Sequence, residues 1–312
     1  MRRLIIILFL TFGCLGSPPE VQIGNWPEGY KSATCITFDT ELATLGQIET
    51  VVNTLGSKNA TFFVVAGYFK DRPEDLEPLR GYEVASMAWE QDEWKNSGLS
   101  HEFQLMEMQM AHDWLLGEGF KPRGFRAPFL KSNKGTINAA IDMGYTYDSS
   151  QYAGIMPYLS SGIVEIPLSM NFDVFWNEKS IGYSTLPLYL AFDNTYKKGG
   201  LFTFYTHVAT AGENIENLSS FLKYAEKKSV WFANAQQVAD WWISKNNLEL
   251  TVDGNSITTK NSGNKPVDGV TIKISPTRQI NGALRTWDDG KTTYAVLPRI
   301  STGEKVLITM NS

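Results

Sequence analysis

Residues 32–39 read SATCITFD, an apolar and β-branched run that ends on Asp39. Such a run is typical of a strand that is buried on both faces of a sheet. The next stretch, LGQIETVVNTLG at 45–56, places its apolar residues at helical spacing and closes on a glycine. Together they predict a strand followed by a helix, which is the repeating unit of a parallel α/β fold.

The same alternation of strand-like and helix-like segments continues along the chain. Strand-like runs recur at ATFFVVAGYF, YEVASMA, IVEIPLSM, GGLFTFYTHV and VWFAN. Helical patterns lie between them, and in the longest, EFQLMEMQMAHDWLLG, the spacing places Phe103, Met106, Met110 and Trp114 on one apolar face. We therefore expect an α/β fold over residues 25–246, a deformed (β/α) parallel barrel of about seven or eight strands.

The texture of the sequence changes near residue 247. From there to residue 312, β-rich runs alternate with Asp-Gly, Gly-Asn and Asn-Gly turns. We expect residues 247–312 to form a small all-β domain of the β-sandwich type, which would serve as a spacer or adhesion module.

The first 24 residues carry a targeting pattern. MRR is a short basic region, LIIILFLTF is an apolar run, and Cys14 follows a glycine. The apolar run has signal-peptide proportions and is too short to span a bilayer. Because Cys14 at the cleavage point resembles a prokaryotic lipoprotein signal, we expect lipidation there, with residues 1–24 forming a signal peptide and a short linker. This predicts a secreted surface protein, anchored on the extracytoplasmic face of a membrane.

The composition limits the kinds of partner and cross-link that we expect for this protein. The net charge is −5, and no cluster of lysine and arginine forms a basic stripe, so we expect no nucleic-acid partner. With Cys14 lipidated, Cys35 has no cysteine to pair with, and no disulfide is expected. The nine tryptophans suit either a large core or a groove that faces carbohydrate.

In parallel α/β barrels the functional residues lie at the carboxyl ends of strands. That rule selects Asp39, the stretch 87–93, Arg126, Asp148 and His207. The four named side chains are those of two acids, one permanent cation and one group that titrates near neutral pH.

The motifs ITFD, ATFFV, GYEVAS, GFRAPF, YDSS and FYTH follow one another along the chain. In this order they resemble the polysaccharide deacetylase family (NodB homology domain, carbohydrate esterase family 4), over roughly residues 30–245. The resemblance implies a deformed (β/α) barrel and a hydrolase that cleaves the carbon–nitrogen amide bond of N-acetylated sugars. It also implies a divalent metal, held by an aspartate and two histidines, that activates water and polarises the amide carbonyl.

Carried onto this chain, the resemblance gives Asp39 the role of general base and Arg126 that of the cation which holds it. His207 falls on the general acid that protonates the leaving amine, and Asp148 lies in the motif whose acid orients or tunes that histidine. The backbone N–H of Phe129 falls where the family offers a donor to the developing oxyanion. A structural ion-pair network at the barrel mouth is the alternative interpretation of the four side chains.

The family's metal ligands do not carry over. Thr40 replaces the second aspartate of the first motif, with Glu41 next to it, and the two histidine positions fall on Met87 and Gln91. A thioether and an amide oxygen are poor zinc ligands, so we expect a degenerate metal site and no cofactor. The alternative left open is a divalent cation, calcium or magnesium, bound through carboxylates. Those carboxylates are Asp39, Glu41, Glu90, Asp92 and Glu93.

The stretch GYEVASMAWEQDEW, residues 81–94, adds two tryptophans beside these positions. We expect Trp89 to contact substrate by stacking on sugar rings, the alternative being that Trp89 and Trp94 pack the loop onto the barrel. Three functions remain open. The preferred one is a surface protein directed at N-acetylated polysaccharide or cell-envelope glycan, with zinc-dependent deacetylation doubtful. The others are an active carbohydrate de-N-acetylase with an atypical metal or none, and a structural interaction protein.

Overall fold

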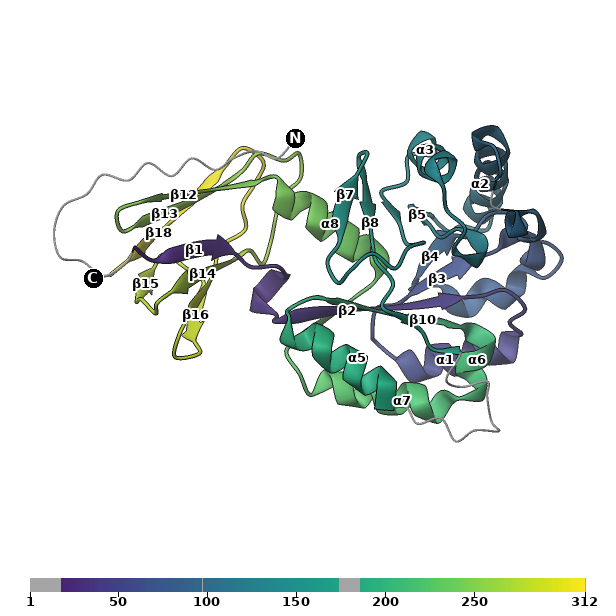
Figure 1. Cartoon of the computed structure of the whole chain (residues 1–312), viewed down its shortest axis with the longest axis horizontal. Coiled ribbons are helices and arrows are strands. Elements are labelled where there is room, and N and C mark those ends of the chain that lie inside the picture. The colour runs from purple at the N-terminus through teal and green to yellow at the C-terminus, as the bar shows by residue number, and fades with distance from the viewer. Residues whose placement is uncertain (1–17, 97, 174–185, 312) are drawn as a thin grey trace.

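The computed structural model describes residues 18–96, 98–173 and 186–311. It contains one curled sheet flanked by helices and, beside it, two smaller antiparallel sheets (Figure 1). In these residues no helix is both long enough and apolar enough to cross a membrane. The expected signal peptide and Cys14 lie outside the described residues.

Ten strands build the curled sheet. They are β2 (Ser32–Asp39), β3 (Thr61–Val64), β4 (Glu83–Ser86), β5 (Gly124–Phe125), β6 (Tyr147–Asp148), β7 (Tyr158–Ser160), β8 (Ile163–Glu165), β9 (Met170–Asn171), β10 (Leu201–His207) and β11 (Val230–Ala233). Nine of them lie in the order β7-β8-β6-β5-β4-β3-β2-β10-β9, and β11 pairs with the first half of β2. All pairs are parallel except β7 with β8.

This curled parallel sheet fits the NodB-like architecture that the sequence predicted. The deformed barrel expected from the sequence is, over the described residues, an open curled sheet with β7 at one edge and β9 at the other. The antiparallel hairpin of β7 and β8 occupies one edge, and β9 pairs through only two residues with β10.

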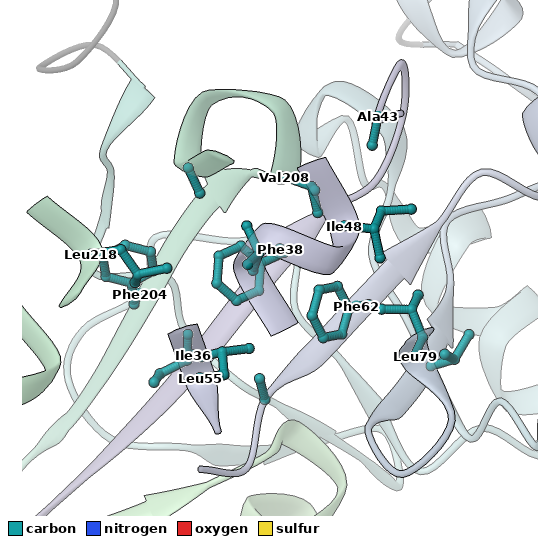
Figure 2. Close-up of a cluster of buried hydrophobic side chains, with 14 of the residues drawn as sticks. Ile36, Phe38, Ala43, Ile48, Leu55, Phe62, Leu79, Phe204, Val208 and Leu218 are labelled. Carbon is teal, nitrogen blue, oxygen red and sulfur yellow. The ribbon is translucent and has the colours of Figure 1, made fainter. Parts of the chain in front are cut away.

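The strand and helix predicted from residues 32–56 are confirmed. Strand β2 is buried along its whole length because β3, β10 and β11 all pair with it. Phe38 of β2 stacks on Phe62 of β3, with ring centroids 5.1 Å apart. Figure 2 shows these rings inside a buried cluster that also includes Ile48 of the following helix and Phe204 of β10. This core fixes the carboxyl ends of β2 and β10 side by side.

The helices are α1 (Leu45–Leu55), α2 (His101–Gly117), α3 (Lys134–Asp142), α5 (Leu186–Lys197), α6 (Val208–Glu213), α7 (Ile215–Glu226) and α8 (Ala235–Asn246). Short 3-10 helices are η1 (Pro27–Gly29), η2 (Ala66–Phe69), η3 (Pro73–Leu79), η4 (Asp92–Lys95) and η5 (Pro128–Leu130). Thr44 caps α1 through a capping box with Gln47, and Gly56 ends it at a φ of 60°.

The apolar face expected for α2 is wrong at two of its four residues, because Trp114 packs against the buried cluster whereas Met106 and Met110 lie at the surface. Met106 and Met110 are 47% and 41% exposed. The buried residues of the helix are Gln104, Glu107, Met108, Ala111 and Leu115. Gln104 faces inward because its amide donates to the carbonyl of Leu99 and to Asn133, the residue that caps α3. The buried face of α2 therefore includes a polar side chain that the apolar pattern did not reveal.

Two four-stranded antiparallel sheets follow α8. Their strands are β12 (Leu248–Asp253), β13 (Ser256–Asn261), β14 (Thr271–Ser275), β15 (Ile280–Asn281), β16 (Arg285–Asp288), β17 (Thr293–Val296) and β18 (Lys305–Met310), joined by β1 (Glu20–Ile23) from the other end of the chain. The strand orders are β1-β14-β17-β16 and β12-β13-β18-β15. The expected linker therefore stops before Glu20, because β1 pairs with β14 and packs Val21 and Ile23 on its core (Figure 1).

One buried cluster joins this β-rich region to the curled sheet. It contains Ala33 of β2, Trp241 of α8 and Ile272 of β14. The indole of Trp241 donates to the carbonyl of Asn25 at 2.7 Å, which holds the chain after β1 against α8. Because the two regions share a core, the chain is best studied whole.

Candidate functional site

The carboxyl edge of the curled sheet collects the polar side chains. Asp39 ends β2 and His207 ends β10, and the two are partners in the register of these strands. Arg126 follows β5 directly, and its backbone N–H donates to the carbonyl of Ser86 at the end of β4. Asp39, Arg126 and His207, which were selected by their positions at strand ends, therefore lie at one edge of the sheet.

Arg126 and Asp39 form a fully buried ion pair. Arg126 Nη1 donates to Asp39 Oδ1 at 2.6 Å, and neither side chain is exposed to solvent. The rest of the guanidinium is also engaged, through Nε to the Ser149 carbonyl and through Nη2 to Thr37 Oγ1. Its Cζ lies over the Phe63 ring, 3.9 Å from the centroid. Arg126 is thus locked in place, and it fixes one oxygen of Asp39.

His207 lies between two carboxylates. Its Nδ1 is hydrogen-bonded to Asp173 Oδ2, and its Nε2 lies 3.1 Å from Glu41 Oε1. The other Asp173 oxygen accepts the backbone N–H of His207 at 3.1 Å and the hydroxyl of Thr206. The imidazole side chain is 31% exposed, so it forms the solvent-facing part of this cluster.

Asp148 makes different contacts from those expected. Its carboxylate accepts the hydroxyl of Ser150 at 2.7 Å and the backbone N–H of Ser150 at 3.2 Å, and it shares a hydrogen bond with Glu165 on β8. In the described residues Asp173, and not Asp148, contacts His207. The reason is topological, because β6 is separated from β10 by four strands whereas Asp173 follows β9, the direct neighbour of β10.

Sequence reasoning missed Asp173 and Glu165. A signal for Asp173 was present, since it is the first acid after the strand-like run that ends at MNF. Glu165 gave no comparable signal, because an acid inside the run IVEIP reads as an ordinary strand residue.

Burial and the neighbouring charged groups shift the pKa values of Asp39 and His207. Burial raises the pKa of Asp39 to about 6, although the charge of Arg126 acts in the opposite direction. Burial lowers the pKa of His207, but its hydrogen bonds to Asp173 and Glu41 outweigh that effect and raise the pKa to about 11. At neutral pH the site therefore holds an imidazolium between two carboxylates.

The family's zinc position does not fit this chain. Met87 is 2% exposed and packs inside a buried apolar cluster. Gln91 donates its amide to the hydroxyl of Tyr68 at 2.8 Å. Thr40 is buried and donates to the carbonyl of Phe63 at 3.1 Å. None of the three offers a usual zinc ligand, and each is already engaged in packing or in a hydrogen bond of its own.

The five carboxylates considered for calcium or magnesium do not form one cluster. Over residues 18–96, 98–173 and 186–311, the group whose potential ligand atoms lie within 4.8 Å of one another is Asp39, Glu41 and His207. Asp92 instead pairs with Lys95 at 2.8 Å on the surface.

Of the two tryptophans, Trp94 has the packing role, while the contact of Trp89 with sugar stays a prediction. Trp94 is 1% exposed and packs on Phe125, so it holds the loop onto the sheet. Trp89 is half-buried against Trp114 and, with Tyr68 and Gln91, helps to line a pocket of about 220 Å³.

Left-handed backbone is concentrated in the loops at this edge. Leu42, Ala88, Phe129 and Leu130 have φ values of 60°, 67°, 55° and 57° and follow β2, β4 and β5. Non-glycine residues in this region cost about 1–3 kcal/mol each and cluster at functional sites. Phe129 is 45% exposed beside the edge, and its role as an oxyanion donor stays a prediction.

A family model described as polysaccharide deacetylase matches residues 28–147. No curated protein sequence matches the chain. A probable polysaccharide deacetylase from Pseudomonas aeruginosa PAO1 superimposes with a TM-score of 0.60 at 18% identity, over 70% of this chain and 93% of that chain. An allantoinase gives a TM-score of 0.60 at 17% identity, over 70% and 92%.

A third solved structure is a mutant, with restored enzymatic activity, of a CE4 family pseudoenzyme from Bacillus anthracis. Its TM-score is 0.51 at 13% identity, over 68% of this chain and 69% of that chain. At such identities the likenesses show a shared fold. Because the fold is found in deacetylases, in an allantoinase and in a pseudoenzyme, the site's own residues must decide the function.

Proposed function

This chain carries a polysaccharide deacetylase domain of a divergent kind, and from that premise we propose that it binds N-acetylated polysaccharide or cell-envelope glycan without the family's zinc-dependent turnover. The observation that carries the proposal is the state of the two lost histidine positions. Met87 is part of the apolar core, and Gln91 is hydrogen-bonded to Tyr68. Zinc held in the family's manner has no ligands there.

The lining of the pocket at Trp89 supports a sugar as its occupant. Trp89 and Tyr68 offer aromatic surface for the CH-rich face of a sugar ring, and Glu90, Gln91 and Asp92 offer hydrogen-bonding groups for hydroxyls. Its volume of about 220 Å³ is below the ~300–1,000 Å³ typical of sites for drug-sized ligands. That size suits one sugar unit of a longer chain.

The test compares oligomers of N-acetylglucosamine with oligomers of glucosamine by isothermal titration calorimetry, using the full chain after treatment with EDTA. We expect saturable binding of the acetylated oligomer, with the deacetylated one at least tenfold weaker. In parallel, acetate release is measured with added zinc, and the variant Thr40→Asp/Met87→His/Gln91→His tests whether the family's ligands restore it. Failure to bind, or zinc-dependent acetate release by the unaltered chain, would refute the proposal.

A second candidate is an active de-N-acetylase that uses an atypical metal or none. The observation in its favour is that the base–cation pair of Asp39 with Arg126 and the oriented imidazole of His207 are both present. Acetate release that persists in EDTA and disappears in Asp39→Asn would favour this candidate over binding alone. The absence of both binding and turnover would leave the structural role.

We also propose that the protein is secreted and held on the extracytoplasmic face of a membrane by lipid on Cys14. The support is the order of a basic start, an apolar run and a cysteine before GSPPE. The two C-terminal sheets would act as a sandwich-like spacer between membrane and glycan site. Partition into a detergent phase that is lost in Cys14→Ala would support the anchor.

A further inference from the structure

Two carboxylate oxygens of the site are buried without a hydrogen-bond partner among the described residues. They are Asp39 Oδ2 and Glu41 Oε2. Asp39 is fully buried, and Glu41 is 8% exposed. A buried polar group left unsatisfied destabilises the fold, the more so when it is charged. Most buried polar atoms have a partner, so two such oxygens in one cluster call for a ligand that they share.

The same two residues converge on His207. One potential ligand atom from each of Asp39, Glu41 and His207 lies within 4.8 Å of the other two. Asp173 is hydrogen-bonded to Nδ1 of His207, so the other ring nitrogen, Nε2, faces Glu41. A histidine whose second nitrogen is fixed by a carboxylate is the usual arrangement of a metal-ligating imidazole.

The charges at this position also favour a cation. Three carboxylates, those of Asp39, Glu41 and Asp173, meet two cations, the guanidinium of Arg126 and the imidazolium of His207. Burying carboxylates is unfavourable unless positive charge compensates them. A divalent ion that displaces the proton of His207 would balance the negative charge that remains beside Arg126.

We propose that Asp39, Glu41 and His207 bind one divalent transition-metal ion, at a position displaced from the family's own. The family's ligands belong to the residue after Asp39 and to the loop after β4, whereas these three come from the ends of β2 and β10 and the turn after β2. One imidazole nitrogen and two carboxylates suit zinc, cobalt or manganese, while calcium takes six to eight oxygens. The ion would occupy the base and the acid of the family's mechanism, so its presence would oppose family-type hydrolysis.

The test titrates cobalt into the full chain, purified without a histidine tag and stripped with EDTA, and follows the visible absorption of the bound ion. We expect one cobalt per chain, displaced by zinc and not by calcium. Glu41→Gln and His207→Gln should each weaken binding at least tenfold. Matched controls are Gln91→Ala at the family's position and His101→Gln, a histidine that pairs with Asp142 elsewhere; both should bind as the unaltered chain does.

Absence of bound cobalt overturns the proposal, and so does binding that Glu41→Gln leaves unchanged or that Gln91→Ala removes. Circular dichroism checks that each variant folds. If a variant does not, proton NMR of the unaltered chain with cobalt still decides, because ligation by His207 must produce strongly shifted imidazole resonances. Glycan binding is measured in EDTA and cation binding without glycan, so either proposal can fail while the other stands.

Discussion

Asp173 holds His207 at two points, because its carboxylate is hydrogen-bonded to the imidazole Nδ1 and also accepts the backbone N–H of the same residue at 3.1 Å. Neither the side chain nor the backbone of His207 can turn without breaking one of these contacts. Nε2 is thereby directed at Glu41, 3.1 Å away. This orientation suits proton transfer, cation binding or hydrogen bonding to an amide.

In the metal-free chain, His207 should remain protonated well above neutral pH. Its pKa is raised from 6.5 to about 11, since hydrogen bonds to Asp173 and Glu41 outweigh the effect of burial. The raised pKa stabilises the fold fully below pH 6.5, and that contribution is lost as the pH rises through about 11. NMR titration of the imidazole carbons measures this directly. Asp173→Asn should lower the midpoint, and an unchanged midpoint would contradict the assignment of Asp173.

Arg126→Met should destabilise the protein by about 3–5 kcal/mol, because it leaves the buried Asp39 without its cation. Urea unfolding of the full chain measures the change. Arg80→Met is the matched control, since Arg80 forms its ion pair with Glu77 at the surface, where such pairs contribute little. Equal losses in the two variants would mean that Asp39 and Arg126 are not a buried pair in solution.

Glu165→Gln should flatten the dependence of stability on pH. Burial and the charge of Asp148 raise the pKa of Glu165 from 4.5 to about 10, so the folded state keeps a proton that the unfolded chain releases. The free energy of unfolding should therefore fall as the pH rises between these values. A glutamine at this position donates its N–H to Asp148 at every pH, so the fall in the free energy of unfolding should disappear. Thermal unfolding at several pH values, with the surface variant Glu93→Gln alongside, provides the measurement.

Trp89→Ala should weaken binding of the N-acetylglucosamine oligomer about tenfold, which corresponds to about 1.4 kcal/mol. The loss is expected because Trp89 forms the aromatic wall of the pocket. Calorimetry measures it, with Trp287→Ala on β16 as a control for loss of a tryptophan elsewhere. A similar loss in both variants, or none in Trp89→Ala, would move the glycan site away from this pocket.

Local patterns in the sequence were sufficient for the elements whose burial is decided by their own residues. Strand β2 and helix α1 appear where the apolar runs and the closing Gly56 predicted them. The strand-end rule placed Asp39 and His207 correctly at the carboxyl edge, because parallel strands in one sheet share that edge.

Contacts between distant segments were decided only by the tertiary structure. The pairing of β1 with β14, the inward turn of Gln104 and the partner of His207 all depend on which residues meet across long stretches of chain. Met87 shows the same division. Its sequence position marks a lost histidine, and only the packing around it shows that the position has become part of the core. A residue's own chemistry determines what it can bind, while its neighbours in space determine whether that capacity is free to be used.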